Sequence, residues 1–538
     1  MTKPPVFILF LLIIGVSRMV YAQQQVWVSD QGNNTYRNPV LHADYSDPDA
    51  IRVGEDYYMT ASSFDAIPGL PILHSRDLVN WSLIGHALKR QPPFEHFEKT
   101  QHGNGVWAPS IRYHNSEFYI YYPDPDFGIY LTKSKNAIGP WSDPVLVEAG
   151  KGLIDPCPLW DDDGNNYLVY AYAGSRAGIK SVIAVKKLNA AGDKTVDAGV
   201  IVYDGHDLDP TIEGPKFYKR NGYYYIFAPG GGVATGWQTV LRSRNVYGPY
   251  ERKVVMDQGT TSVNGPHQGA WVDTPLGENW FLHFQDKGAF GRVVHLQPLK
   301  WLNDWPVIGS DVDGDGKGEP VTVYQKPATS RKYAIAAPPE SDEFNSHLLG
   351  LQWQWQANPK ATWAFASSNG FLRLYASRVS DSITNYWEVP HVLLQKFPAE
   401  AFKVTTRITF KPNVKIENER TGLIVMGQSY AYVGLKSTKD GVKLVYVKCI
   451  HAASGASENE IVLADLGQHV VYLRVTVSAD AKCAFSYSVD NKDYVSIESD
   501  FIAEAGRWIG AKVGLFCTRT QPTNDSGYAD VDWFHVEK

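Results

Sequence analysis

The chain has 538 residues, with 51 Lys and Arg against 57 Asp and Glu, and a formal net charge of −6. Hydrophobic residues make up 44% and charged residues 20%, which excludes a disordered chain or a coiled coil. The acidic balance argues against a nucleic-acid partner. Aromatic residues reach 13%, beside 46 Gly and 32 Pro, and this combination is typical of an all-β protein with many turns.

Residues 1–22 are typical of a secretory signal peptide. Lys3 precedes an apolar run, Val6 to Val16, that is too short to span a membrane, and Val20-Tyr21-Ala22 offers a cleavage site before Gln23. An uncleaved anchor is the alternative, but no basic stop-transfer flank follows and no other stretch approaches membrane-spanning length. We therefore expect an exported protein, periplasmic or secreted, without a membrane span.

An aromatic pattern repeats five times over the first three-fifths of the chain. In each repeat a turn rich in Gly, Asn and acidic residues precedes an aromatic residue; these are Tyr57, Phe118, Tyr167, Tyr223 and Trp280. Repeats of about 50 to 60 residues, each with roughly four short alternating runs, are typical of propeller blades. We predict a five-bladed β-propeller over residues 23–327, with a β-sandwich with long loops as the alternative.

A second domain follows the repeats. Residues 328–340 carry Pro and Ala and are predicted to be a linker. Residues 341–538 hold more alternating segments and no helix-period segment of useful length, which predicts one β-sandwich. The chain has four cysteines, too few for a disulfide scaffold, and we expect buried thiols, with one disulfide among the last three as the alternative; they are Cys157, Cys449, Cys483 and Cys517.

Acidic residues stand at equivalent places in three of the repeats. The innermost strand of each blade lines the propeller axis, so residues just before the aromatic hairpins should converge there. These positions carry Asp47, Asp155 and Glu213, and the other two carry Trp107 and His267. Hydrolysis of a glycosidic bond needs an acid for the leaving oxygen and a carboxylate for water, and a third acid can raise the donor's pKa by repulsion. A cation site on the axis is the competing interpretation.

The ordered motifs resemble those of glycoside hydrolase family 43, five-bladed propellers that act on arabinose- and xylose-containing glycans. The resemblance implies that Asp47 is the general base, Glu213 the general acid, and Asp155 the acid that raises the donor's pKa and orients it. It also implies inversion of configuration. Asp47 and Asp155 could instead only form turns before proline. The motifs span all five repeats: Ser46-Asp-Pro-Asp49, Trp107-Ala-Pro109, Ile154-Asp-Pro156, Glu213-Gly-Pro215 and Gly291-Arg292.

The same resemblance implies a set of substrate contacts. Arg292 would bind hydroxyls of the terminal sugar, and Phe64 and Trp107 would wall its site, although each could serve blade packing alone. His267 would contact substrate or, as in some members, a water-bound Ca²⁺, with an ordinary hydrogen-bonded His as the alternative. Two residues depart from the family pattern and are expected to reshape the pocket; they are Asp49 and Cys157.

A possible structural Ca²⁺ site lies outside these motifs. Asp311, Asp313 and Asp315 have the spacing of an EF-hand loop, but its twelfth position is Thr322 and no helices flank it. A solvated acidic loop is therefore favoured. We expect no cofactor to be required.

The expected function is an exo-acting, inverting hydrolase that releases terminal α-L-arabinofuranosyl units from plant cell-wall hemicellulose oligosaccharides. A β-D-xylosidase is the alternative, and a non-catalytic glycan-binding propeller is less favoured than either enzyme. The trailing sandwich, expected to be concanavalin-like, resembles the accessory domain of exo-acting members, which lends a loop to close one end of the pocket. We expect residues 518–524 to form that loop.

Overall fold

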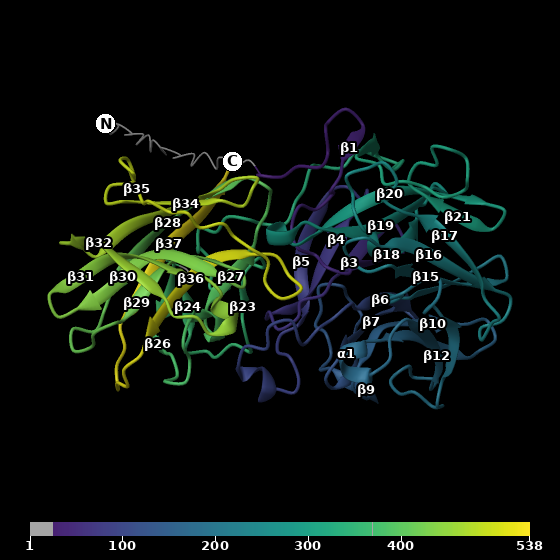
Figure 1. Ribbon diagram of the computed structural model, residues 1–538, viewed down its shortest axis with the longest axis horizontal. Helices are drawn as coiled ribbons and strands as arrows, with labels where there is room; N and C mark the ends of the chain where they lie inside the picture. The colour runs from purple at the N-terminus through teal and green to yellow at the C-terminus, as the bar shows by residue number, and fades with distance from the viewer. Residues whose placement is uncertain (1–24, 368) are drawn as a thin grey trace, which may run out of the picture.

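The structure is a computed structural model that describes residues 25–367 and 369–538, so the predicted signal peptide lies outside the described residues. Two β-rich bodies lie side by side, the first in purple to teal and the second in green to yellow (Figure 1). Helical structure in the described ranges is limited to α1 (Gly174–Ala177) and four 3₁₀ turns: His96–Glu98, Gly288–Phe290, Tyr386–Glu388 and Ala452–Ser454. No helix within those ranges is long and apolar enough to cross a membrane.

The first body is a five-bladed propeller, as predicted. Between Asp49 and Ile308 it comprises five antiparallel sheets, each built from four strands that follow one another in the chain. The blades are β2 (Asp49–Val53), β3 (Asp56–Thr60), β4 (Gly69–Ser75) and β5 (Trp81–Leu88); β6 (Ser110–His114), β7 (Glu117–Asp124), β8 (Gly128–Ser134) and β9 (Val145–Ala149); β10 (Leu153–Trp160), β11 (Asn166–Tyr172), β12 (Val182–Leu188) and β13 (Val200–Asp204); β14 (Lys216–Arg220), β15 (Tyr223–Gly230), β16 (Trp237–Ser243) and β17 (Glu251–Met256); and β18 (His267–Asp273), β19 (Asn279–Asp286), β20 (Arg292–Leu302) and β21 (Trp305–Ile308).

Aromatic side chains pack between neighbouring blades, which explains their abundance. Tyr218 of the fourth blade meets Trp271 of the fifth edge-on, with ring centroids 5.2 Å apart. Phe227 stacks against Phe281 across the same boundary at 6.0 Å. Large flat rings fill the wedge between two twisted sheets, and the polar atoms of Tyr218 and Trp271 have hydrogen-bonding partners. Of the repeated aromatic residues, Tyr57 and Trp280 lie in one buried cluster that spans the first and last blades, and Phe118 meets Tyr58 of the first blade at 5.0 Å.

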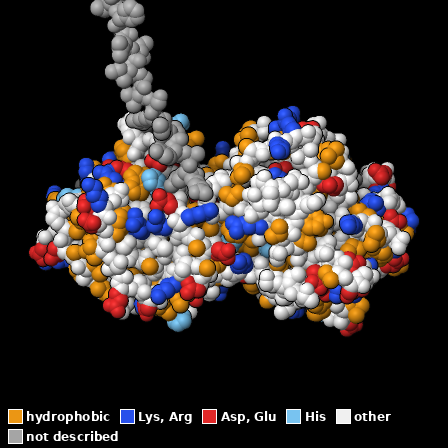
Figure 2. Space-filling view, turned by 90° about the horizontal axis from the view of Figure 1, so that it is seen from above, with side chains coloured by type: hydrophobic (Ala, Val, Ile, Leu, Met, Phe, Trp, Pro, Cys, Tyr) orange, Lys and Arg blue, Asp and Glu red, His pale blue; other side chains and the backbone are white. Residues whose placement is uncertain are grey.

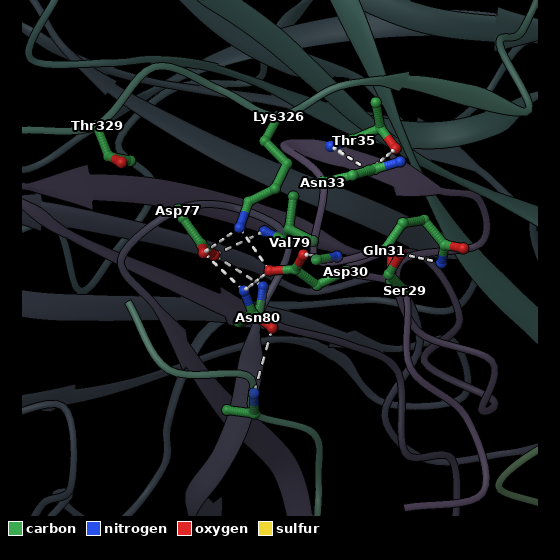
Figure 3. A network of polar contacts seen from close by, with 12 residues as sticks. Ser29, Asp30, Gln31, Asn33, Thr35, Asp77, Val79, Asn80, Lys326 and Thr329 are labelled. Atoms are coloured by element: carbon green, nitrogen blue, oxygen red, sulfur yellow. Dashed lines mark hydrogen bonds and ion pairs between the residues drawn. The ribbon is translucent and has the colours of Figure 1, made fainter. Parts of the chain in front are cut away.

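Strand pairing and a polar network join the two ends of the propeller chain. No blade combines strands from both ends, because each blade is built from four consecutive strands. Strand β1 (Thr35–Arg37) pairs with β22 (Val323–Gln325) after the last blade. The Lys326 ammonium lies 2.5 Å from Asp30 Oδ2 and 3.7 Å from Asp77 Oδ2, and Asn80 Nδ2 donates to both carboxylates (Figure 3). This cluster ties the segment before the propeller to the first blade and to the chain that leaves the last one.

The second body is a β-sandwich of two sheets in the described chain, as predicted, and their strands pair antiparallel except for β26 with β36. Apolar side chains from both sheets form its core, among them Leu423, Leu473 and Val531, which are fully buried. The four cysteines are buried free thiols, also as predicted. One sheet contains β23 (Gln354–Trp355), β26 (Ser377–Arg378), β27 (Leu393–Lys396), β29 (Arg420–Met426), β30 (Tyr430–Thr438), β31 (Gly441–Cys449), β32 (Asn459–Leu466) and β36 (Lys512–Arg519); the other contains β24 (Ala364–Ser367), β25 (Phe371–Tyr375), β28 (Phe402–Lys411), β33 (Val470–Val477), β34 (Cys483–Ser488), β35 (Val495–Ser496) and β37 (Tyr528–Glu537).

The two bodies are packed together, and a waist separates them in the space-filling view (Figure 2). Trp27, from the segment before the propeller, and Phe290 of the last blade belong to the hydrophobic core of the sandwich. Ile67 and Trp355 exchange backbone hydrogen bonds across the boundary. The interface therefore fixes the position of sandwich loops relative to the propeller.

Candidate active site

The acids singled out in the sequence lie on the axis at the start of their blades. Asp47 precedes β2, Asp155 lies in β10, and Glu213 precedes β14. All three line one cavity together with residues from every blade and one residue of the sandwich; the lining is Asp47, Phe64, Trp107, Ala108, Ile154, Asp155, Glu213, Val233, Gln268, Arg292 and Trp508. Six of the seven predicted site residues therefore meet in one place, and His267 lies just behind it.

Two of the acids occupy strained backbone conformations. Asp47 has φ 55° and Asp155 has φ 57°, in the left-handed region that residues with a Cβ rarely adopt, and each precedes a proline. Such conformations cost about 1 kcal/mol or more and persist where the surrounding structure enforces them. Here they turn each carboxylate out of its strand and into the axial cavity.

Asp47 is buried and surrounded by donors. Its Oδ2 accepts hydrogen bonds from Ser46 Oγ at 2.7 Å and from Ser62 Oγ at 2.5 Å. Its Oδ1 lies 3.4 Å from Arg292 Nη1. Two hydroxyls and a guanidinium are partners that hold an ionised carboxylate in one orientation. The Asp47 carboxylate is thus held in one orientation at the cavity.

Asp155 is buried beside Glu213 and is linked to it through the backbone. Its Oδ2 accepts the Gly214 N–H at 2.7 Å. Burial, followed by the negative charge of Glu213, raises the pKa of Asp155 well above its ordinary value. A side chain at Gly214 would meet Gln268 Cγ at 2.6 Å, so glycine is required for this approach. The contact orients the chain directly after Glu213, and the repulsion disfavours ionisation of both acids together.

Glu213 is the most open of the three acids, with 31% of its side chain exposed. Its Oε1 lies 2.9 Å from Nε2 of His267, whose ring is fully buried. The other ring nitrogen, Nδ1, has no hydrogen-bonding partner among the described residues. The structure thus places His267 against the acid, outside the set of residues that line the cavity.

Arg292 is buried, and its guanidinium faces the cavity. Nη1 donates to Ser46 Oγ at 2.8 Å, and the guanidinium carbon lies 4.9 Å from the Phe284 ring centroid and 5.8 Å from that of Trp508. Aromatic faces hold a planar guanidinium in place without using its N–H groups. Nε is buried and lies 3.9 Å from Asp286 Oδ2, whereas Nη2 has no hydrogen bond to a described residue and can meet hydroxyls in the cavity.

Trp508 closes one side of the cavity, and sequence reasoning missed it. It comes from the sandwich loop 505–510, and its ring meets Trp107 at 6.2 Å with an interplanar angle of 68°. The expectation that residues 518–524 close the pocket is wrong, because β36 carries Thr518 to the far end of the strand, where its hydroxyl contacts Tyr386 at 2.6 Å. The one sequence signal was a Trp between two glycines, Gly506 and Gly510.

Asp44 holds this sandwich loop against the propeller. Its Oδ1 accepts the backbone N–H of Arg292 at 3.0 Å, and its Oδ2 accepts that of Gly510 at 3.0 Å. The carboxylate is buried, so both bonds are shielded from water. The Asp44 side chain therefore connects the backbone of Arg292 with the loop that carries Trp508.

The two departures from the family pattern lie behind the cavity and do not line it, which corrects the expectation that they reshape it directly. Asp49 Oδ2 accepts from Arg112 Nη1 at 2.6 Å and from the Ile111 N–H at 2.7 Å. Arg112 Nη2 also approaches Cys157 Sγ at 2.8 Å. These residues form a buried ion pair that joins three blades below the catalytic carboxylates.

The acidic loop of the last blade holds its carboxylates close together. One oxygen from each of Asp311, Asp313 and Asp315 lies within 4.8 Å of the others, near enough to share a cation. Backbone N–H groups already occupy both oxygens of Asp311, and Lys317 pairs with Asp257 at 2.7 Å. These contacts fit the solvated acidic loop favoured by the sequence.

Two family models together match most of the chain. Residues 36–306 match glycosyl hydrolases family 43, and residues 341–537 match the β-xylosidase C-terminal concanavalin A-like domain. The second match supports the expectation of a concanavalin-like sandwich.

Curated relatives span nearly the whole chain. A putative β-xylosidase of Xylanibacter ruminicola is 41% identical, covering 91% of this chain and 88% of its own. A β-xylosidase of Formosa agariphila is 32% identical, covering 95% and 92%. A more distant relative, at 28% identity with 93% and 94% covered, is a non-reducing end α-L-arabinofuranosidase of Bacteroides ovatus.

Among solved structures, a xylan β-1,4-xylosidase of Bacillus halodurans C-125 superposes with a TM-score of 0.82 at 25% identity, covering 93% of this chain and 100% of its own. Both the propeller and the sandwich therefore have counterparts in one solved enzyme. With its propeller matched by the family model and its relatives matched over both domains, the chain belongs to glycosyl hydrolases family 43 and is a glycosidase.

Proposed function

We propose that this glycosidase is an exo-acting, inverting β-D-xylosidase that releases terminal xylosyl units from xylan-type oligosaccharides. The observation that carries the proposal is the convergence of Asp47 and Glu213 on a cavity that Trp508 walls on one side. The relatives from Xylanibacter ruminicola and Formosa agariphila, which match 91% and 95% of this chain, are both named as β-xylosidases, one of them putatively. The arabinofuranosidase that sequence reasoning placed first becomes the second candidate, supported by the name of the relative at 28% identity.

The roles of the acids follow from their surroundings. Glu213, the most exposed, donates its proton to the glycosidic oxygen as the bond from that oxygen to the anomeric carbon breaks. Asp47 takes a proton from a water molecule whose oxygen forms the new bond on the opposite face, and the product has inverted configuration. Asp155 orients the backbone after Glu213, and its own pKa is raised by burial and by the negative charge of Glu213.

The substrate contacts explain a preference for chain ends. Arg292 offers free N–H donors to sugar hydroxyls, and Trp107 and Trp508 present aromatic surface to the apolar face of a sugar ring. Because Trp508 enters from the second domain, a longer glycan cannot continue past it on that side. The cavity therefore takes a terminal residue, with the rest of the oligosaccharide extending outward.

Initial rates on para-nitrophenyl β-D-xyloside and α-L-arabinofuranoside test the proposal. We expect faster turnover of the xyloside, and a loss of at least about a thousandfold in kcat in Glu213→Gln and Asp47→Asn. Asp381→Asn, a change at an exposed acid of the sandwich, is the matched control and should leave both rates unchanged. A chelator should also leave them unchanged, because the acid pair needs no metal.

The products separate the remaining alternatives. NMR of the first turnovers should show α-xylose from a β-xyloside, and xylo-oligosaccharides should yield xylose alone. Faster turnover of the arabinofuranoside would favour the second candidate, and full activity in Glu213→Gln would contradict the assignment of the acid.

We also propose that the protein is exported, on the basis of residues 1–22. Sequencing the N-terminus of the mature protein from periplasmic and culture fractions tests this, with Gln23 expected as the first residue. A mature chain that still begins at Met1 would contradict it.

A further inference from the structure

A second cavity lies between the two domains and shares none of its lining with the active site. Its walls come from four parts of the chain: the segment before the propeller, the first blade, residues 336–340 of the linker, and the sandwich. It adjoins the polar network of Figure 3, since Ser29 and Val79 also line it. The cavity therefore exists only where both domains are packed together.

Lys396, at the end of β27, brings a positive charge into this cavity without a partner. It has neither a hydrogen bond nor an ion pair to any described residue, and its ammonium lies 5.3 Å from the centroid of the Tyr45 ring. Burial lowers the pKa of Lys396 to about 8. Asp44 influences it from a distance, but that carboxylate is already bonded to the Arg292 and Gly510 N–H groups.

Further polar groups in the same walls lack partners. Gln395 is 3% exposed and its Nε2 has no acceptor, and His42 is 2% exposed with neither ring nitrogen bonded. His86 also lines the cavity, and burial lowers its pKa to about 3, so it is neutral and carries one N–H donor. A buried hydrogen-bond donor without an acceptor costs about 1–3 kcal/mol. The walls thus hold the Lys396 ammonium and the Gln395 amide as donors without an acceptor, beside one unpartnered acceptor, Gln352 Oε1.

The propeller side of the lining is mostly apolar, with Val40, Leu41, Pro71, Val79 and Leu83. Polar atoms come from Ser29, Gln352, Gln354 and the linker residue Glu340, whose carboxylate accepts the Val26 N–H at 3.1 Å. Surplus donors beside an apolar wall match a ligand with an anionic end and a hydrocarbon body. We propose that the interdomain cavity binds a small organic carboxylate, with its charged end at Lys396 and Gln395 and its body on the apolar wall.

Binding of sodium hexanoate and sodium benzoate to the full chain, measured by calorimetry, tests the proposal. We expect saturable binding of at least one acid, and binding at least about tenfold weaker for hexan-1-ol or benzyl alcohol, since a charged hydrogen bond would be lost. Lys396→Met should weaken binding of the acid by at least about tenfold. Lys439→Met, at an exposed lysine of the sandwich, is the matched control and should leave it unchanged.

Affinity should also depend on pH in one direction. The ammonium form binds the carboxylate, so affinity should fall about tenfold for each unit above about pH 8, where the free amine predominates. The titratable and charged neighbours are His42, Asp44 and Tyr45 before the first blade, His86 on β5, Glu340 of the linker and Lys512 on β36. Burial raises the pKa of Glu340 to about 7, about one unit below that of Lys396. A lost pH dependence above about pH 8 in Lys396→Met assigns the effect to Lys396.

Ala337→Trp, in the linker wall, provides a second variant that should block binding by filling the cavity. Turnover of the aryl xyloside reports that each variant is folded. Absence of binding to the wild type at about 10 mM acid, equal binding by Lys396→Met, or equal affinity for the alcohols would each overturn the proposal.

Discussion

Asp44 provides a direct test of whether the sandwich positions the active site. In Asp44→Ala the backbone N–H groups of Arg292 and Gly510 both lose their acceptor in a buried place. Each unsatisfied donor costs about 1–3 kcal/mol. The attachment of loop 505–510 to the propeller through Asp44, called the clamp below, should therefore weaken by about 2–6 kcal/mol, and by less where water enters. Asp44→Asn keeps one acceptor oxygen and should lose about half as much.

The loss should appear in catalysis through the loop that carries Trp508. We expect about 1.4–2.8 kcal/mol of the lost free energy to come from the position of Trp508 at the cavity. The kcat/KM on the aryl xyloside should then fall about 10- to 100-fold, mostly because KM rises. Asp381→Ala, at an exposed acid, is the matched control and should change nothing.

A double-mutant cycle with Trp508→Ala identifies the route of the effect. When the wall is already absent, removing the clamp should cost little more, so the two changes should be non-additive by at least about 1 kcal/mol. Additive losses, or a loss confined to kcat, would refute the argument that Asp44 acts through Trp508. A normal urea midpoint in Asp44→Asn would show that its kinetic loss is not simply unfolding.

Two further predictions concern pH. Burial raises the pKa of Asp124 to about 7, so its contribution favours the fold below about pH 4 and is lost as pH rises to about 7. Asp124→Asn should thus gain up to about 4 kcal/mol over wild type at pH 8 and nothing at pH 3 in urea unfolding; equal gains at both would contradict this. Second, kcat/KM should be bell-shaped in pH, because Asp47 must be ionised while Glu213 is protonated, and a flat profile from about pH 4 to about 9 would exclude that pairing.

The convergence of the three acids on one cavity could be predicted because they combine a local motif with the symmetry of the fold. Once five aromatic repeats indicate blades, the first strand of each blade is expected to start at the propeller axis. Asp47, Asp155 and Glu213 were therefore identifiable without any knowledge of long-range packing. Their strained φ angles and their hydroxyl or backbone donors, by contrast, appear only in the folded chain.

The wall of the pocket could not be predicted in the same way. Gly510 and Asp44 meet across 466 positions in the chain, and neither stands in a repeat or a motif. Alternation of apolar and polar residues identifies a strand, but it does not show which end of the strand faces another domain. The sequence therefore predicts the pocket loop at residues 518–524, at the wrong end of β36. The position of His267 behind Glu213, rather than in the cavity wall, was hidden for the same reason.

The structure divides the task between the domains. In the proposed mechanism every group that moves a proton comes from the propeller, where blade symmetry brings acids together, and the Trp508 wall comes from the sandwich. Bond cleavage and chain-end selection can therefore vary independently in sequence. Changes in residues 505–510 should alter which oligosaccharide lengths are accepted while leaving the pH profile intact, whereas changes around Asp47 or Glu213 should do the opposite. A Trp508→Gly variant that shifted the pH profile without changing length preference would show that the two tasks are not separated in this way.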